Sequence, residues 1–210
     1  MHSYTYVIAV DFEATCWEKQ PPPQWRDAEI IEFPAILVNL RTGKVESQFH
    51  KYVKPVELPQ LSKYCTNLTG IQQKTVDAGV PVQTALDLFI EWLKRELKER
   101  DLTLPKMSEA EPLGNCLLSS WTDWDFGICL AKECVRKDMR KPGCFDQWMD
   151  ARAIFRQFYN YRPYNFSNAL AYLKLNFQGR AHSGIDDAKN LATLLCKMYR
   201  TELRWRSPRT

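Results

Sequence analysis

Three strand-like runs follow one another near the start of the chain, and they limit the possible folds more than any other feature. Tyr4 to Val10 is a continuous β-branched and aromatic run, short enough for a buried strand. Glu29 to Leu40 is a second run, in which Pro34 requires an edge or bulge position. Val45 to Val53 is a third run, which follows a turn sequence at 41–44. Because the connections are short, the runs predict an antiparallel meander.

Helical periodicity dominates the rest of the chain. Apolar residues from Val82 to Glu99 recur at offsets of three and four, which predicts an amphipathic helix. We expect further helices at 125–135, 150–159, 166–173 and 184–200, short strands at 113–118 and 145–149, and an exposed loop at 103–112. A meander followed by alternating helices and strands predicts an α/β fold, with a mixed central sheet flanked by helices.

Length and composition indicate one globular domain. The 210 residues suit a single domain, whose core we place at about residues 4–203. No apolar run reaches the roughly 18 to 20 residues of a membrane span, and no signal-peptide core opens the chain. Seven cysteines without a C-x-x-C pair indicate reduced thiols rather than a disulfide framework or a zinc ribbon. We therefore expect an intracellular protein, in the cytoplasm, the nucleus or both, with no membrane partner.

The charge is unevenly distributed along the chain. The net charge is +4, but Ala151 to Thr210 holds eleven basic and three acidic residues. The first 150 residues are therefore net acidic. A basic C-terminal part, ending in a short basic tail, is compatible with a phosphate backbone as partner. A solvated polar face explains the same charge equally well.

Two carboxylates, Asp11 and Glu13, directly follow the first strand-like run. Side chains two apart in a strand point the same way, so both carboxylates face one side of the sheet. Two like charges about 4 Å apart repel by about 4 kcal/mol at an effective dielectric near 20. A cation must therefore lie near them, or one of them must be protonated. The alternative is a strand end that simply turns polar.

A histidine and two aspartates mark the expected start of the last helix. Ser183 and Asp186 resemble a capping box, which places a helix start here. Asp187 shares a helical stripe with two leucines and is expected to point inward, whereas Asp186 points outward. An inward carboxylate is costly unless it is paired or bound to a metal. His182 precedes this helix; of the other histidines, His2 is terminal and His50 is more typical of a structural residue within a strand.

A third polar segment contains Trp124 between Asp123 and Asp125. Either aspartate can cap a helix N-terminus. Trp124 can belong to the core or can form a platform on which a base stacks.

The segments described above resemble the motifs of the DEDDh exonucleases, and within them the Eri-type (enhanced-RNAi, Snipper-like) 3′→5′ exonucleases. The resemblance covers the chain from about Tyr4 to Leu203. Its motifs are Val10-Asp11-Phe12-Glu13-Ala14-Thr15-Cys16, Ile30-Ile31-Glu32-Phe33-Pro34, Leu68-Thr69-Gly70-Ile71, Trp124-Asp125, and His182 with Asp187 five residues later. The resemblance selects Asp125 rather than Asp123 as the third acid. It implies an RNase H-like exonuclease fold, in agreement with the meander and helices.

The resemblance also implies a mechanism and a set of site residues. The catalytic set is His182 as general base with Asp11, Glu13, Asp125 and Asp187, and these four acids are the ligands of two divalent cations, Mg²⁺ or Mn²⁺. Hard cations of this kind prefer oxygen ligands. The residues expected to hold the substrate are Ala14, Trp124, Leu68 and Thr69. The expected partners are 3′ ends of RNA, DNA or both, and the expected product is a nucleoside 5′-monophosphate.

Two other functions compete with the exonuclease. A catalytically silent nucleic-acid-binding module could keep the same fold, but binding alone does not require a cluster of like charges. A phosphatase or nucleotidase could use the same two-metal chemistry on small molecules. The basic C-terminal part and Trp124 favour a polymeric substrate.

Overall fold

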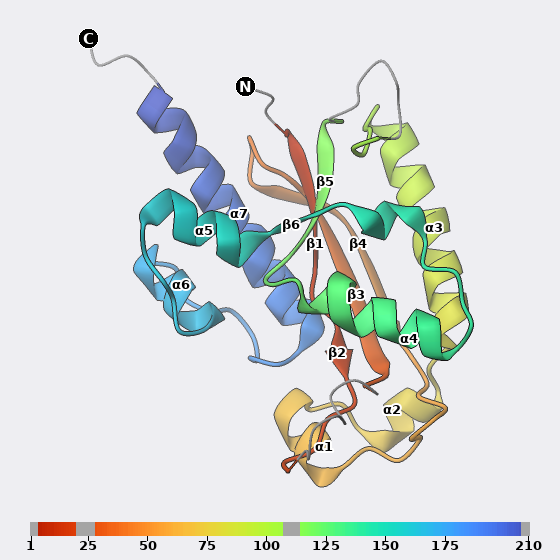
Figure 1. The fold of residues 1–210 in the computed structure, drawn as a ribbon. Coiled ribbons are helices and arrows are strands. Elements are labelled where there is room, and N and C mark those ends of the chain that lie inside the picture. The colour runs from red at the N-terminus through yellow and green to blue at the C-terminus, as the bar shows by residue number, and fades with distance from the viewer. Residues whose placement is uncertain (1–3, 20–27, 107–113, 207–210) are drawn as a thin grey trace.

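A mixed sheet of six strands forms the centre of the molecule (Figure 1). The structure is a computed structural model that describes residues 4–19, 28–106 and 114–206, with side chains as far as Thr201. The strands are β1 (Tyr6–Val10), β2 (Glu13–Ala14), β3 (Ile30–Asn39), β4 (Lys44–Tyr52), β5 (Cys116–Ser120) and β6 (Trp148–Asp150). Strand β3 pairs antiparallel with β1, β2 and β4, whereas β5 joins β1 and β6 joins β5 in parallel. The predicted meander with added parallel strands is confirmed.

The two faces of the sheet bury separate hydrophobic cores. Successive side chains of a strand point to opposite faces, so Ile8 and Val10 enter one core while Val7 and Ala9 enter the other. The first core is covered by α3 (Val82–Glu99), by a π-helical turn (Trp124–Leu130) and by the α4 helix (Ala131–Arg136) that continues it. The second is covered by α5 (Ala151–Tyr159), α6 (Phe166–Tyr172) and α7 (Gly184–Arg206) (Figure 1).

The helices follow the predicted order with local differences. The expected 125–135 helix begins as the π-helical turn, and the strand expected at 145–149 is a 3₁₀ turn (Gly143–Asp146) followed by β6. Two short helices at the lower end of the sheet, α1 (Lys63–Thr69) and α2 (Gln73–Asp77), were not predicted (Figure 1). Helices of five to seven residues carry too few turns to show a periodicity.

Two expectations about exposed or irregular positions hold only in part. Pro34 lies in β3, which has neighbours on both sides, and not at an edge. It falls at an irregular position, opposite the interruption between β1 and β2, where the pairing to β3 passes from Val10–Ala35 to Glu13–Glu32. Residues 103–106 of the loop expected at 103–112 form neither helix nor strand, but Leu104 among them is buried. The residues from 107 onward lie outside the described part of the chain.

The cysteines and the helices bear on two further expectations from the sequence. All seven cysteines are free thiols. None of the helices in the described ranges has the length and apolar character that crossing a membrane requires.

Candidate active site

A break between β1 and β2 positions the first two acidic side chains. Asp11 and Phe12 connect the two strands, and Glu13 opens β2. Phe12 turns into the core, where it is 3% exposed, so Asp11 and Glu13 on either side of it face away from that core. The Phe12 backbone N–H donates a 2.8 Å hydrogen bond to Oδ1 of Asp125. This hydrogen bond connects the segment between β1 and β2 to the π-helical turn.

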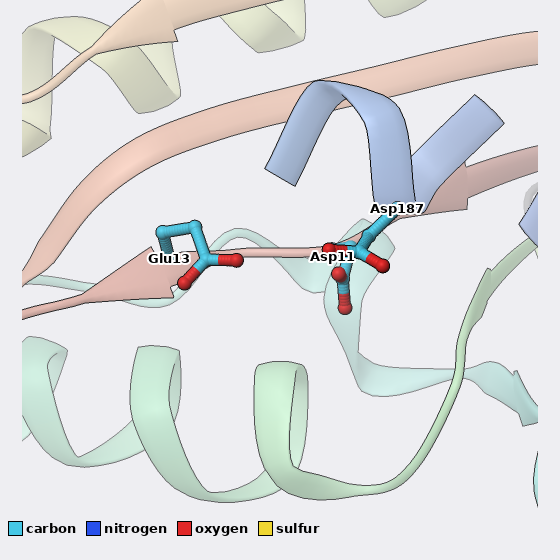
Figure 2. A group of neighbouring side chains, drawn as sticks. All are labelled: Asp11, Glu13 and Asp187. Atoms are coloured by element: carbon cyan, nitrogen blue, oxygen red, sulfur yellow. The ribbon is translucent and has the colours of Figure 1, made fainter. Parts of the chain in front are cut away.

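Helix α7 brings the third acid to the same place. Carboxylate oxygens of Asp11, Glu13 and Asp187 all lie within 4.8 Å of one another, and we call these three residues the acid cluster (Figure 2). A Cβ atom on Gly184 would lie 2.7 Å from the backbone oxygen of Asp11. Only glycine therefore lets the helix begin this close to the strand. Asp187 also accepts a 2.7 Å hydrogen bond from the backbone N–H of His182.

Asp125 lies beside the acid cluster rather than within it. Its side chain is 3% exposed and is held by the Phe12 N–H. No oxygen of Asp125 belongs to the group within 4.8 Å. Its charge nevertheless contributes to the raised pKa values of Asp11 and Glu13. The structure therefore brings three of the four predicted acids into direct proximity and places the fourth as their electrostatic neighbour.

The pKa values of the four acids are strongly shifted, and burial is the first cause in each. Burial raises the pKa of Asp11 well above its usual value, and the charges of Asp125, Asp187 and Glu13 raise it further. Burial, followed by the charges of Asp187 and Glu32, raises the pKa of Glu13 to about 9. Burial also raises the pKa values of Asp125 and Asp187 to about 7, although backbone hydrogen bonds oppose the shift in both. Burial and mutual repulsion therefore oppose the simultaneous ionisation of these carboxylates.

The donor set fits divalent cations. Within the described residues, no lysine, arginine or histidine forms an ion pair with any member of the acid cluster. Three carboxylates whose oxygens converge offer hard ligands of the kind that Mg²⁺ and Mn²⁺ prefer. A bound cation would supply the positive charge that the chain itself does not provide.

His182 stands at the mouth of the same site. It is exposed, and its backbone has φ +62°, an uncommon value for a residue other than glycine. With Asp11, Glu13 and Asp187 it lines a cavity of about 350 Å³. Its ring accepts or donates no hydrogen bond within the part of the chain that the structure describes, so the ring nitrogens remain open to a ligand or to water.

Another part of the lining of this cavity is aromatic and basic. Trp121 and Phe166 form it, with ring centroids 5.0 Å apart, together with Arg152. Arg152 is held by its Nη2, which donates to the Pro163 carbonyl at 3.1 Å, while its buried Nε has no hydrogen-bond partner among the described residues. The cavity thus combines three acids, a histidine, a stacking surface and a cation.

Comparison with known proteins identifies the family. The family model described as exonuclease (RNase_T) matches residues 8–195. The chain belongs to the exonuclease family. It is 66% identical over 200 residues to the 3′-5′ exonuclease Snipper of Drosophila melanogaster, covering 95% of this chain and 71% of that protein. It is 45% identical to ERI1 exoribonuclease 2 of Xenopus laevis, covering 93% of this chain but only 28% of that protein.

Solved structures agree with this membership. The nuclease domain of 3′hExo, a DEDDh family member bound to rAMP, superposes with a TM-score of 0.82 at 32% identity, covering 94% of this chain and 93% of that one. A 3′-exonuclease that recognises the 3′ end of the histone mRNA stem-loop superposes with a TM-score of 0.84 at 32% identity, covering 96% and 84%. The predicted DEDDh family, RNase H-like fold and 3′→5′ exonuclease class are confirmed.

None of the four residues expected to hold the substrate lines the acidic cavity. Ala14 is 7% exposed in the core, and Trp124 packs against the same core without lining the acidic cavity. Leu68 and Thr69 end α1, and the Thr69 hydroxyl donates to the Cys65 carbonyl at 2.9 Å. Thr69 lines a separate hollow of about 270 Å³. Their substrate roles stay predictions.

Three residues of the cavity wall were missed by the sequence reasoning: Trp121, Arg152 and Phe166. Trp121 lies in the segment that drew attention to Trp124, and the motif resemblance selected Trp124. Arg152 lies in the first turn of α5 and is joined to Trp121 by a hydrogen bond from its backbone N–H to the Trp121 carbonyl, at 3.0 Å. Such a contact is not visible in a sequence pattern.

The expected details of the last helix need two corrections. The capping box predicted between Ser183 and Asp186 is not what the structure has: Asp186 accepts from the backbone N–H of Arg180 at 2.9 Å. Asp186 was expected to point outward, but it is only partly exposed, and Asn190 one turn later is 3% exposed with its side chain hydrogen-bonded to Gln178. Asp187 itself points into the acid cluster, as its stripe predicted.

The basic tail is only partly described. Arg200 donates to the Thr42 carbonyl, 2.6 Å away, and so fixes α7 to the turn between β3 and β4. The side chains of Arg204, Arg206 and Arg209 lie outside the described part of the chain.

Proposed function

We propose that this chain is a 3′→5′ exoribonuclease domain, spanning about residues 4–203, that removes nucleoside 5′-monophosphates from RNA 3′ ends. The observation that carries the proposal is the acid cluster, whose converging carboxylates have no cation to pair with among the described residues. Membership of the exonuclease family supports hydrolysis of phosphodiester bonds as the reaction at this site. RNA as substrate is supported by the names of the relatives, which are exoribonucleases or 3′-exonucleases that bind a histone mRNA stem-loop or rAMP.

The metal ligands that we propose are Asp11, Glu13 and Asp187, with Asp125 completing the set for two divalent cations. Asp125 is close enough to raise the pKa of Asp11 and Glu13, although the Phe12 N–H engages one of its oxygens. When bound, the cations would neutralise charge on the phosphate and make the attacking water more acidic. Whether the cations are Mg²⁺ or Mn²⁺ is a question for the assay below.

His182 is the proposed general base. It would take a proton from the attacking water as the water oxygen bonds to phosphorus and the bond from phosphorus to the 3′ oxygen breaks. The leaving 3′ oxygen would take up a proton, so the products are a nucleoside 5′-monophosphate and a strand shortened by one nucleotide. The exposed ring at the cavity mouth supports this role, because a base must meet water and substrate at once.

The remainder of the cavity suits a nucleotide chain. A base can stack on the surface formed by Trp121 and Phe166. Arg152 lines the cavity and offers its positive charge to a phosphate. These features favour a polymer over a small phosphate ester.

A labelled-RNA assay tests the function. RNA labelled at its 3′ end and RNA labelled at its 5′ end are each incubated with Mg²⁺ or Mn²⁺, with EDTA as control. We expect the 3′ label to be released first, as mononucleotide, and only with metal. Internal fragments, or no cleavage with either metal, would contradict the proposal. Matched RNA, DNA and hairpin substrates in the same assay measure the sugar and strand preference.

Substitution of His182 tests the mechanism. His182→Ala should reduce turnover by about 10²- to 10⁴-fold, the usual contribution of a general base. It should still bind metal, since the proposed ligands are carboxylates, and calorimetric titration with Mn²⁺ measures this. Near-normal turnover would show that the histidine is not the base, and lost metal affinity would make it a ligand.

An intracellular location, in the cytoplasm, the nucleus or both, is proposed with this function. It is supported by the seven free thiols, which are typical of reducing compartments.

A further inference from the structure

Glu32 is a buried carboxylate that no step of the proposed reaction uses. It lies in β3, is 1% exposed, and is the register partner of Glu13 across the strand pair. Like charges directly opposite each other in a sheet are destabilising. The charge of Glu32 also contributes to the raised pKa values of Asp11, Glu13 and Asp187. A buried anion in this position needs a compensating partner.

That partner is the beginning of α7. Oε2 of Glu32 accepts a 3.0 Å hydrogen bond from the backbone N–H of Gly184, and Oε1 accepts a 3.2 Å bond from the N–H of Ile185. The first N–H groups of a helix have no partners within the helix, and the helix dipole favours an anion there. Glu32 therefore caps α7 from a strand that lies far away in the sequence.

This cap fixes the segment that carries the proposed chemistry. His182 lies two residues before Gly184, and Asp187 lies three residues after it. The turn between them is held on one side by the bond from His182 N–H to Asp187 and on the other by Glu32. The close approach of Gly184 to the Asp11 carbonyl brings the same segment against the end of β1. The position of α7 relative to the acid cluster thus depends on Glu32.

The side chain of His50 also contacts the Glu32 carboxylate. Its Nε2 lies 2.8 Å from Oε1 of Glu32, and its ring packs against Tyr52 with centroids 4.9 Å apart. Both carboxylate oxygens of Glu32 are therefore engaged by the chain, and neither belongs to the group of converging oxygens in the acid cluster. This arrangement argues against Glu32 as a further metal ligand.

We propose that Glu32, oriented by His50, is a positioning residue that sets His182 and Asp187 against Asp11 and Glu13. The proposal rests on the proposed exonuclease function, because it assigns Glu32 a role in that reaction. Glu32 is 1% exposed, borders the separate hollow and does not line the acidic cavity, so it acts on the reacting groups through α7. Its loss should therefore displace the reacting groups rather than remove one of them.

Amide hydrogen exchange tests the cap without reference to activity. In metal-free protein, Glu32→Ala should speed exchange at the Gly184 and Ile185 amides by about 10- to 100-fold, the loss expected for hydrogen bonds to a charged group. Glu133→Gln is the matched control, since Glu133 is another fully buried glutamate that accepts a backbone N–H, that of Ile30, at 2.8 Å. This control should leave exchange at 184 and 185 unchanged. Unchanged exchange in Glu32→Ala would overturn the proposal.

Turnover measurements then distinguish positioning from a merely structural role. Glu32→Ala should lower kcat by about 10- to 100-fold with little change in KM, as misplaced catalytic groups do. The double variant with His182→Ala should lose less than the product of the two single losses, because part of the Glu32 effect passes through His182 and the rest through Asp187. Glu32→Gln, which keeps the shape and one acceptor oxygen, should recover part of the loss and serves as the variant of choice if Glu32→Ala does not fold.

Three results would overturn the positioning role. They are wild-type turnover in Glu32→Ala, losses that multiply in the double variant, and a selective loss of Mn²⁺ affinity in Glu32→Gln, which would make Glu32 a ligand. Inactivity of the wild-type protein on every RNA tested is a different failure. It would refute the proposed function, whereas hydrogen exchange at the Gly184 and Ile185 amides would still test whether Glu32 caps α7.

Discussion

Two groups of neighbouring carboxylates lie near the start of β3, and they differ in how their negative charge is compensated. The lysine-centred group consists of Glu29, Glu133 and Lys137. Lys137 Nζ lies 2.8 Å from Glu29 and 2.6 Å from Glu133, whose side chains are both 0% exposed. The acid cluster of Asp11, Glu13 and Asp187 has no such cation among the described residues.

The pKa shifts of Glu29 and Glu13 reflect this difference, although burial still raises the pKa of Glu133. Hydrogen bonds from Lys137 and from the backbone N–H groups of Val56, Glu57 and Leu58 overcome burial at Glu29, so the pKa of Glu29 is lowered. Burial is not overcome at Glu13, whose pKa rises to about 9. In the lysine-centred group, negative charge is compensated by Lys137, and the group stabilises the fold. The acid cluster has no compensating cation among the described residues, which is the property expected of a metal centre.

The largest effect should come from removing a carboxylate of the acid cluster. Asp187→Asn should lower turnover by about 10³-fold or more, since metal activation supplies several kcal/mol. Its metal-free stability should be unchanged or higher, because one repelling charge is gone. Single-turnover assays and thermal unfolding in EDTA measure the two quantities. More than about a tenth of wild-type turnover would contradict the ligand assignment.

Removing the cation of the lysine-centred group should produce the converse result. Lys137→Met leaves two buried carboxylates uncompensated and should cost about 3–5 kcal/mol of unfolding free energy. Turnover per folded molecule should stay near the wild-type value. Urea denaturation together with the RNA assay checks this prediction. A stable but inactive variant would mean that this group belongs to the active site after all.

The pH dependence of stability should also separate the two groups. In EDTA, Asp125 and Asp187 with pKa values of about 7, and Glu13 with about 9, bind protons in the folded state that the unfolded chain has already released near pH 4. The contribution of these three carboxylates to the free energy of unfolding is therefore fully present below about pH 4 and is lost as pH rises toward 7 to 9. Saturating Mg²⁺ should abolish this decline. Glu29, with its lowered pKa, contributes the opposite slope, lost as pH falls through the acidic range.

Thermal unfolding from pH 5 to pH 9, with and without Mg²⁺, measures this difference. Stability that does not fall with pH in EDTA would show that the acids are compensated by groups of the chain.

The smallest effect is expected at Asp186, the neighbour of a cluster member. Its carboxylate accepts the Arg180 N–H and does not join the cluster, so Asp186→Asn should change turnover by no more than about two-fold. Steady-state rates on the same RNA measure it. An inactive Asp186→Asn beside an active Asp187→Asn would reverse the two assignments.

The sequence predicted those features that depend on local pattern. The strand runs, the long helix from Val82 and the inward direction of Asp187 each follow from a periodicity within a few turns or residues. Patterns of this kind, with the motif resemblance, were enough to identify the family and the fold.

Features that depend on distant contacts could not be predicted. Pro34 is accommodated by an interruption in a different strand. The cap of α7 comes from Glu32, which lies 152 residues before Gly184 in the chain. The separation of Asp125 from the cluster depends on a hydrogen bond to Phe12. Each is set by tertiary packing, which a linear pattern does not record.

The close packing of α7 on β1 has a consequence for the synthesis of this protein. Asp11 and Glu13 are made among the first residues of this chain, whereas His182, Gly184 and Asp187 are made among its last. A growing chain therefore holds two members of the acid cluster but lacks the third until nearly all of the domain has been translated. On the proposed function, an enzyme that degrades RNA stays inert while the ribosome is still reading this part of its own messenger.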